Sequence, residues 1–165
     1  AVAFCTQLTA QEQAAGRLPA GWAYVLPTES QWEYACRAGT TTAYSWGATI
    51  TSSNANYNWD GGANDGNDFK QTRDVGQYAA NPWGFFDMHG NVWEWTTDWY
   101  NATYPTGNPV IDPIESNPSS YRVIRGGSWV DDGGHQRSTR RGIATPIESN
   151  RYYGLGLRVS LQKSQ

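Results

Sequence analysis

The residues whose chemistry stands out most are oxygen donors in the segment 87–100, DMHGNVWEWTTDWY. Asp87 and Glu94 carry carboxylates, and the backbone carbonyls of Gly90 and Val92 lie between them. Calcium takes oxygen ligands from flexible loops, so these four positions are candidate ligands of one calcium ion. The segment does not match the regular calcium-loop motif, and a core strand behind a tight turn would need the same residues. Both interpretations stay open on spacing alone.

A second group of oxygen donors lies in the segment 40–68, which is rich in Thr, Ser, Asn, Gly and Asp and is expected to be a loop. A loop of this length in a compact domain is usually functional, or is held by an ion or by aromatic anchors. The candidate ligands are Asn56, Asp60, Asp65, Asn67 and Asp68. The same residue types form ordinary turns, so a purely structural role is the alternative.

Catalysis by side chains is the third chemistry to consider, in the segment 128–142, SWVDDGGHQRSTRRG. His135 is close in sequence to Asp131, Asp132 and Ser138. A Ser-His-Asp triad is defined by spatial geometry, however, and no nucleophile-elbow pattern surrounds Ser138. Adjacent carboxylates at 131 and 132 point apart in an extended segment, which disfavours a paired acid–base site. With 2 histidines in the chain, a His-rich transition-metal site is not expected.

A turn and a strand are expected to position the first group. The turn His89-Gly90-Asn91 contains residue types that tolerate positive φ, so the chain can fold sharply and direct its carbonyls inward. Tryptophans at 93, 95 and 99 then alternate with Glu94 and Asp98. This period predicts a strand with large rings on one face and acids on the other face or at its end.

Two helices are predicted before the long loop. The first spans 1–15 and is stopped by Gly16, with an apolar stripe of Val2, Phe4, Cys5 and Leu8. A short strand is expected at 22–26. Further strands are predicted at 72–75, 121–124 and 155–161, and a turn at 81–84.

The second helix has a clear start and end. Thr28 is its predicted N-cap, Gln31 completes a capping box, and Gly39 ends the helix. Its inner face is expected to carry Trp32, Ala35 and Cys36. Its outer face is expected to leave Glu29, Glu33 and Arg37 to solvent or to local ion pairs.

Composition limits the class of protein. A chain of 165 residues is one domain's worth, and its 9 Trp, 10 Tyr and 18 Gly indicate a loop-rich fold built around rings. A net charge of −3 argues against broad nucleic-acid binding. No apolar run reaches the length of a membrane span and no targeting signal is visible, which leaves the localisation open. Cys5 and Cys36 could pair, but two buried thiols are favoured.

Several motifs, in this order, carry a family resemblance: LPTESQWEYACRAGT, DMHGNVWEWTTDWY, YRVIRGGSW, RSTRR and GLGLRV. Together they resemble the formylglycine-generating enzyme family, also called the sulfatase-modifying-factor domain. The resemblance implies one α+β domain over residues 1–165, with a C-type-lectin-like fold, long loops and little regular structure. Because the chain opens inside an expected helix, an N-terminal truncation of that domain is one interpretation.

The resemblance also implies site residues. Two calcium sites would fall on Asp87, Gly90, Val92 and Glu94, and on Asn56, Tyr57, Asn67 or Asp68, and Phe69. In the enzymes, two cysteines after the GGS motif bind copper and oxidise a substrate cysteine. Here Asp131 and about Gln136 stand in their places, and these oxygen donors cannot replace thiolates for Cu(I). We therefore expect no copper and a chain that is not this oxidase.

The segment 122–158 carries seven arginines against three acids, so this end of the chain is locally positive. Arg125, Arg137 and Arg158 are expected to tie loops together, since guanidinium groups suit carbonyls and carboxylates. The positions between them have no strand or helix period and are expected to be displayed on loops for ligand binding. These positions are Val130, Asp131, Asp132, His135, Gly142, Ile143, Ala144, Thr145, Tyr152, Tyr153 and Gly154.

This displayed set resembles a more particular subgroup, the variable proteins of diversity-generating retroelements, although Leu157 replaces the subgroup's usual phenylalanine. Two functions follow from the resemblances. One is a non-catalytic domain that binds a protein or other surface ligand through a variable face on a calcium-stabilised scaffold. The alternative is an enzyme, or an enzyme-associated regulatory domain, of the formylglycine-generating enzyme family.

Overall fold

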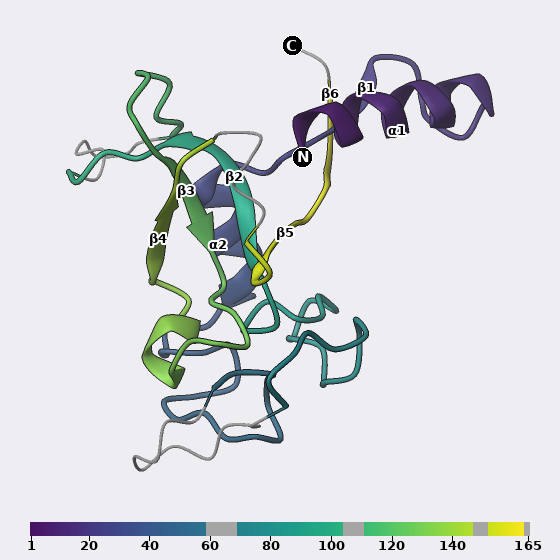
Figure 1. The fold of residues 1–165 in the computed structure, drawn as a ribbon. Coiled ribbons are helices and arrows are strands. Elements are labelled where there is room, and N and C mark those ends of the chain that lie inside the picture. The colour runs from purple at the N-terminus through teal and green to yellow at the C-terminus, as the bar shows by residue number, and fades with distance from the viewer. Residues whose placement is uncertain (59–68, 104–110, 147–151, 164–165) are drawn as a thin grey trace.

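The structure is a computed structural model that describes residues 1–58, 69–103, 111–146 and 152–163. Within these ranges the chain forms two sheets, a short pair β1–β6 and a four-stranded sheet in the order β4-β3-β2-β5. Helix α1 lies beside the short pair, helix α2 lies behind the larger sheet, and long loops gather below it (Figure 1). The predicted mixture of few regular elements and long loops is confirmed.

Strand β2 (Trp93–Trp99) is central in the larger sheet. It pairs antiparallel with β3 (Arg122–Arg125) and parallel with β5 (Leu155–Leu157). Strand β4 (Arg141–Ala144) pairs antiparallel with β3 and forms one edge. Strand β4 was not predicted, because Arg-Gly-Ile-Ala has no alternation of polar and apolar residues.

Helix α2 (Glu29–Arg37) is built as its sequence predicts. Thr28 accepts a hydrogen bond from the Gln31 backbone N–H, and the Gln31 side chain accepts one from the Thr28 backbone N–H. The helix ends at Ala38, which adopts a left-handed conformation. Trp32 and Cys36 pack with Met88 in a buried cluster between the helix and the sheet. The capping box and inner face are thus confirmed.

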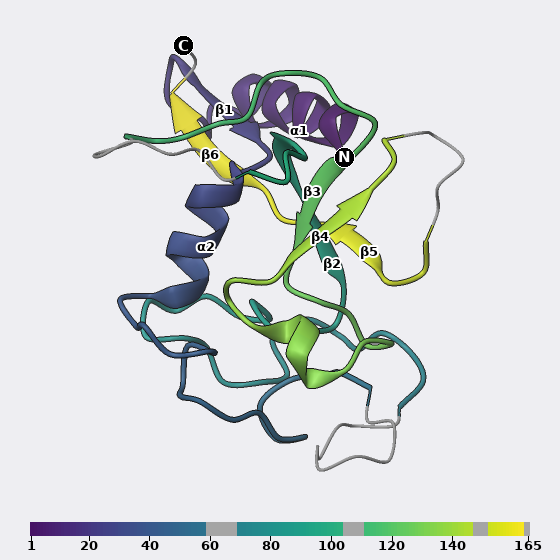
Figure 2. The same ribbon diagram turned by 90° about the vertical axis from the view of Figure 1, so that its left-hand side faces the viewer.

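Helix α1 (Val2–Ala14) and β1 (Trp22–Val25) lie together at the top of the domain as Figure 2 shows it. The Thr9 hydroxyl accepts from the Tyr24 backbone N–H at 2.8 Å and so closes the free edge of β1. Of the predicted apolar stripe, Cys5 is buried, but Val2 is 69% exposed. The predicted apolar stripe was wrong in part, because only one narrow row of α1 side chains, Cys5, Leu8, Thr9 and Glu12, is shielded from solvent.

The predicted C-terminal strand is two strands. β5 joins the larger sheet, and β6 (Ser160–Lys163) pairs antiparallel with β1. The chain crosses between the sheets at Arg158 and Val159, so its last residues connect the two halves of the domain. The turn at 81–84 is confirmed, because the Asn81 side chain accepts from the backbone N–H groups of Trp83 and Phe85.

The strand predicted at 72–75 was wrong. The Asn91 side chain accepts from the Arg73 backbone N–H at 2.9 Å and donates to the Arg73 carbonyl at 3.1 Å. A side-chain amide thus satisfies the backbone that a neighbouring strand would otherwise have paired.

Candidate functional site

The side chains of strand β2 alternate in burial as predicted, but the face that carries Glu94 and Asp98 is turned to the interior. Glu94, Thr96 and Asp98 are buried, whereas Trp95 and Trp99 are half-buried. Asp98 accepts from the backbone N–H groups of Glu29 and Glu115. The buried acids therefore hold neighbouring backbone and side-chain groups in place. The hydrogen bonds that they accept offset the cost of removing their charge from water.

Of the oxygens predicted to hold one calcium ion, the Glu94 carboxylate is bound by the Arg158 guanidinium. Arg158 donates to both carboxylate oxygens of Glu94 at 2.8 Å, and to the Phe86 carbonyl at 2.9 Å. The Asp87 carbonyl lies 3.5 Å from the same guanidinium, and the Asp87 carboxylate accepts from the Gly76 N–H. Trp32 also donates to Glu94, so three N–H groups occupy that carboxylate.

The turn between these two acids has the predicted backbone. Gly90 and Asn91 have φ values of 86° and 67°. A Cβ on Gly90 would lie 2.4 Å from the Asn56 carbonyl oxygen, so this position requires glycine. The Gly90 carbonyl accepts from the Val92 N–H at 2.9 Å. The structure thus places the predicted backbone ligands at a tight turn directly beside Asn56.

The second predicted calcium group is described only in part. Asn56 is buried, and its Oδ1 atom meets no hydrogen-bond donor among the described residues. Tyr57 is buried beside it, and Phe69 is exposed beneath Arg73. Asn67 and Asp68 lie outside the described residues, as do Asp60 and Asp65. No group of three or more His, Cys, Asp or Glu side chains that could hold a metal occurs in the described ranges.

The residues in the places of the two catalytic cysteines both hold the loop together. The Asp131 carboxylate accepts from Ser128 and, at 2.8 Å, from the Trp93 indole N–H. The Gln136 side chain is fully buried and donates to the carbonyls of Ser128, Asp131 and Asp132. These contacts make a rigid loop between β3 and β4.

The described geometry does not assemble a Ser-His-Asp triad. The buried Ser138 hydroxyl lies 3.6 Å from the Cys36 sulfur, whereas His135 contacts Asp132 and Arg140. Asp132 caps the 3-10 helix Gly133–Gln136 by accepting from the backbone N–H groups of Gly134 and His135. His135 and Asp132 therefore contact each other, but Ser138 is buried and contacts Cys36 instead.

The interior histidine is His89. Its Nδ1 donates to the Gln136 carbonyl at 2.6 Å, its Nε2 accepts from the Ser45 N–H at 3.2 Å, and the Cys36 sulfur lies 3.5 Å away. Burial lowers the pKa of His89 to about 4 and raises the pKa of the Cys36 thiol to about 12. Both groups are neutral at pH 7, and a neutral buried thiol is a poor nucleophile. Cys5 and Cys36 are free and buried, as predicted.

The predicted ligand-binding residues gather around one hollow of about 420 Å³ beside β4. Seven of them line it: Asp131, His135, Gly142, Ile143, Ala144, Thr145 and Tyr152. Residues that the prediction omitted complete the lining: Trp93, Tyr121, Ile124, Arg140 and Leu155. Val130, Asp132, Tyr153 and Gly154 lie outside this lining, although Tyr153 stacks on Tyr152 with ring centroids 4.6 Å apart.

Two members of the set are confined by packing. A Cβ on Gly142 would lie 2.8 Å from Ile124 and from Trp93, and Gly154 is buried against Ser128. Gly142, Ile143 and Ala144 lie in strand β4 rather than in a loop. Side chains displayed to solvent are Ile143, Tyr152 and Tyr153.

The arginines divide differently from the prediction. Arg125 is fully buried between Glu33 and the carbonyls of Ser138 and Arg140. Arg137 is exposed, but its side chain hydrogen-bonds Tyr44, and its predicted role in tying loops together stays a prediction. Arg141, which the prediction did not single out, makes two bonds to Glu29 at 2.7 and 2.9 Å.

Glu29 was predicted to face solvent or a local partner and is instead buried. Its partners Arg125 and Arg141 are about a hundred residues away in the chain, so no local signal could have indicated the pairing.

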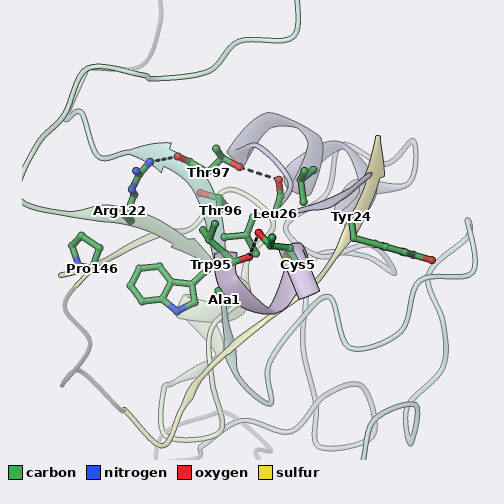
Figure 3. Close-up of a pocket in the computed structure, with 12 residues that line it drawn as sticks. Ala1, Cys5, Tyr24, Leu26, Trp95, Thr96, Thr97, Arg122 and Pro146 are labelled. Carbon is green, nitrogen blue, oxygen red and sulfur yellow. Dashed lines mark hydrogen bonds between the residues drawn. The ribbon is translucent and has the colours of Figure 1, made fainter. Parts of the chain in front are cut away.

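A larger hollow, of about 600 Å³, lies between the start of α1 and the larger sheet (Figure 3). Val25, Leu26 and Trp95 contribute apolar walls. At one end Arg122 donates to the Thr97 carbonyl, and its guanidinium lies 3.6 Å from the centre of the Trp99 ring. None of the site residues predicted from the sequence is among the described residues that line this larger hollow.

Comparison with known proteins agrees with this architecture. The fold is α+β and C-type-lectin-like, of the formylglycine-generating-enzyme subtype. Residues 1–161 match the sulfatase-modifying factor enzyme 1-like domain, and the chain belongs to this family. Among the described helices, none has the length and apolar character needed to cross a membrane.

Three relatives show how widely the domain is used. A formylglycine-generating enzyme of Streptomyces coelicolor is 38% identical over 115 residues, covering 64% of this chain and 36% of that protein. Serine/threonine-protein kinase pkn1 of Chlamydia caviae is 35% identical over 132 residues, covering 78% and 20%. Hercynine oxygenase of Mycolicibacterium smegmatis is 34% identical over 152 residues, covering 84% and 34%. The chain therefore spans a fifth to about a third of these relatives.

Two solved structures resemble the whole arrangement. Treponema denticola variable protein 1 superposes with a TM-score of 0.69 at 31% identity, covering 86% of this chain and 48% of that one. PvdO from Pseudomonas aeruginosa superposes with a TM-score of 0.74 at 24% identity, covering 96% and 58%. The second likeness concerns the fold alone.

Proposed function

We propose that this chain is a non-catalytic domain that recognises a protein ligand through the hollow beside β4 and the tyrosines at its rim. The observation that carries the proposal is the gathering of seven predicted positions around that one hollow. Exposed Ile143 and Tyr152 line it, the Tyr153 ring lies against Tyr152, and tyrosines give large contact area at low entropic cost. The similarity to Treponema denticola variable protein 1 favours the same use of the fold, a variable face such as diversity-generating retroelements produce.

The alternative is an enzyme or an enzyme-associated regulatory domain, since several relatives are named as enzymes. The chemistry of the loop after β3 weighs against the copper oxidase. Asp131 and Gln136 offer oxygen and nitrogen atoms there, and their contacts with Ser128 and Trp93 use those atoms to hold the loop. Incubating the domain with copper, oxygen and a cysteine-containing sulfatase peptide should yield no formylglycine in the peptide, as mass spectrometry would detect. Conversion of that cysteine would overturn the non-catalytic proposal.

A calcium ion is part of the proposal, and the support differs between the two groups of ligands. The unpartnered Asn56 Oδ1, buried at the start of the second group, is the kind of atom that a calcium ion would satisfy. In the first group, Arg158 already supplies a positive charge to Glu94. The ion is therefore proposed at Asn56 and the Tyr57 carbonyl, where it would hold the start of the long loop.

A selection experiment tests the binding proposal. A random peptide library displayed on phage is selected on the immobilised domain, and the enriched clones are measured against two double variants. Ile143→Ser/Tyr152→Ala changes the hollow, and Val75→Ser/Ile111→Ser changes exposed side chains outside its lining. Enriched clones should lose at least about tenfold in affinity for the first variant, roughly 1.4 kcal/mol, and retain affinity for the second.

Two results would overturn the proposal. One is a set of clones that bind Ile143→Ser/Tyr152→Ala as tightly as the unchanged domain. The other is a library that yields no clone whose binding depends on the hollow.

A further inference from the structure

The hollow carries a cation whose position is fixed by two neighbours. An Arg140 N–H lies 3.1 Å from His135 Nε2, and His135 Nδ1 lies 3.1 Å from the Asp132 carboxylate. A guanidinium has only donors, so Nε2 must accept and Nδ1 must carry the proton toward Asp132. Asp132 is itself held by the backbone N–H of Gly134 at 2.7 Å. Asp132 and His135 therefore orient Arg140 at the edge of the hollow.

The charge of Arg140 is not neutralised within the described structure. No carboxylate lies within ion-pair distance of it there, whereas Arg125, Arg141 and Arg158 each meet a glutamate. Among the described residues that line the hollow, Asp131 is the one acid, and its carboxylate is engaged by Ser128 and Trp93. Arg140 thus keeps most of its five N–H groups for a ligand.

The floor beside this cation is apolar. Ile124, Gly142 and Leu155 line it together with Trp93, whose ring meets His135 edge-on at 6.4 Å. Tyr121 and Tyr152 form parts of the wall and add hydroxyl groups. An apolar floor next to one oriented guanidinium is complementary to an apolar side chain next to a carboxylate.

We propose that the partner protein is recognised through an acidic side chain adjacent to an apolar one, with the carboxylate on Arg140 and the apolar group against Trp93 and Ile124. This inference rests on the proposed function and names the chemistry of its ligand. The carboxylate would accept two hydrogen bonds from the planar guanidinium, which gives direction as well as attraction. The apolar group would cover the floor and exclude water from that pair.

Two blocked tripeptides test the inference, acetyl-Phe-Glu-Phe-amide and the same peptide with Gln in place of Glu. Each is titrated into the folded domain, and binding is followed by NMR through the Trp93 indole N–H signal and the backbone amides of residues 142–145. The Glu peptide should bind about tenfold more tightly than the Gln peptide at low salt. That preference should shrink when ionic strength rises to about 1 M, where charges are screened within roughly 3 Å.

Variants separate Arg140 from general electrostatic attraction. Arg140→Gln should abolish the preference for the Glu peptide, and Arg140→Lys should retain part of it because the charge stays while the planar fork is lost. Arg17→Gln is the matched control, an exposed arginine whose partner Glu12 lies in α1. Because the Arg140 side chain is exposed, both variants should fold, which their melting temperatures check.

The outcomes distinguish the inference from the function on which it rests. Equal binding of both peptides, with no effect of Arg140→Gln, would overturn acid recognition and leave the hollow as a binding site. The same holds if neither peptide shifts the signals while selected library clones still depend on Ile143 and Tyr152. If no library clone depends on the hollow, the proposed function and this inference both fail.

Discussion

Arg158 and Glu94 form a two-pronged ion pair, with Nε to Oε2 and Nη2 to Oε1 distances of 2.8 Å each. Glu94 belongs to the central strand and Arg158 to the crossing between β5 and β6, so the pair joins the two sheets. The Glu94 side chain is nearly inaccessible, and Trp32 of α2 donates to it as well. One buried carboxylate therefore connects three separate elements.

Removing one partner of this pair should be strongly destabilising. Arg158→Ala leaves a buried negative charge with one neutral donor, and we expect a loss of about 3–5 kcal/mol in the free energy of unfolding. Urea denaturation measures it. Glu94→Gln/Arg158→Met, which removes both charges, should recover part of the loss, because no unpaired charge remains. A single variant as stable as the unchanged domain would show that the pair contributes little.

The local part of the fold could be predicted from the sequence. Thr28 and Gln31 are a capping box whose bonds span three residues, and Gly90 and Asn91 form a turn from residue types that tolerate positive φ. Short-range signals of this kind do not depend on the rest of the chain. The elements that they define came out within one or two residues of their predicted bounds.

The long-range part of the fold could not be predicted from the sequence. Glu29 reads as a solvent-facing helix residue, and only the folded chain brings Arg141 to it. The segment 72–75 reads as a strand, and only the folded chain presents the Asn91 amide to Arg73. Seven of the positions predicted for ligand binding line the hollow, but Trp93 and Ile124 come from β2 and β3 and share no sequence pattern with them.

Calcium should raise the stability of the domain by mass action, because an ion bound by the folded state alone shifts the unfolding equilibrium. We expect EDTA to lower the melting temperature and added calcium to restore it. Asn56→Ala should abolish the response by removing the unpartnered Oδ1. Asn54→Ala is a nearby control, since its side chain accepts from the Thr51 N–H. If EDTA leaves the melting temperature unchanged, calcium is not part of the folded domain.

Acid should weaken the domain through His89. Its pKa is about 4 in the folded state because burial lowers it, against an ordinary 6.5 when unfolded. Between these pH values the unfolded chain binds a proton at His89 that the folded chain does not bind. The contribution of neutral His89 to stability is therefore fully present above pH 6.5 and is lost as pH drops toward 4.

The expected loss is about 3 kcal/mol at the acidic end of this window. Urea denaturation at a series of pH values measures it. In His89→Gln the amide can still donate to the Gln136 carbonyl but does not titrate, so the pH dependence should be shallower in that window. Parallel pH profiles for the two proteins would assign the acid sensitivity to other groups.

Two isoleucines on neighbouring strands give the sharpest separation of scaffold from displayed surface. Ile124 in β3 is 6% exposed and Ile143 in β4 is 47% exposed, and both line the hollow. Ile124→Ala should cost about 2–5 kcal/mol, because it leaves a cavity against Trp93 and Gly142. Ile143→Ala should change stability by about 0.5 kcal/mol or less, as is usual at the surface.

Binding should depend on Ile143 once folding is accounted for, even though stability does not. Among molecules that remain folded, Ile143→Ala should weaken the selected peptides, because its side chain lies where a ligand would cover it. Thermal melts and titrations of the two variants at equal folded concentration provide the comparison. If Ile143→Ala unfolds the domain while Ile124→Ala leaves it stable, then β4 is core, and the binding face must lie elsewhere on the molecule.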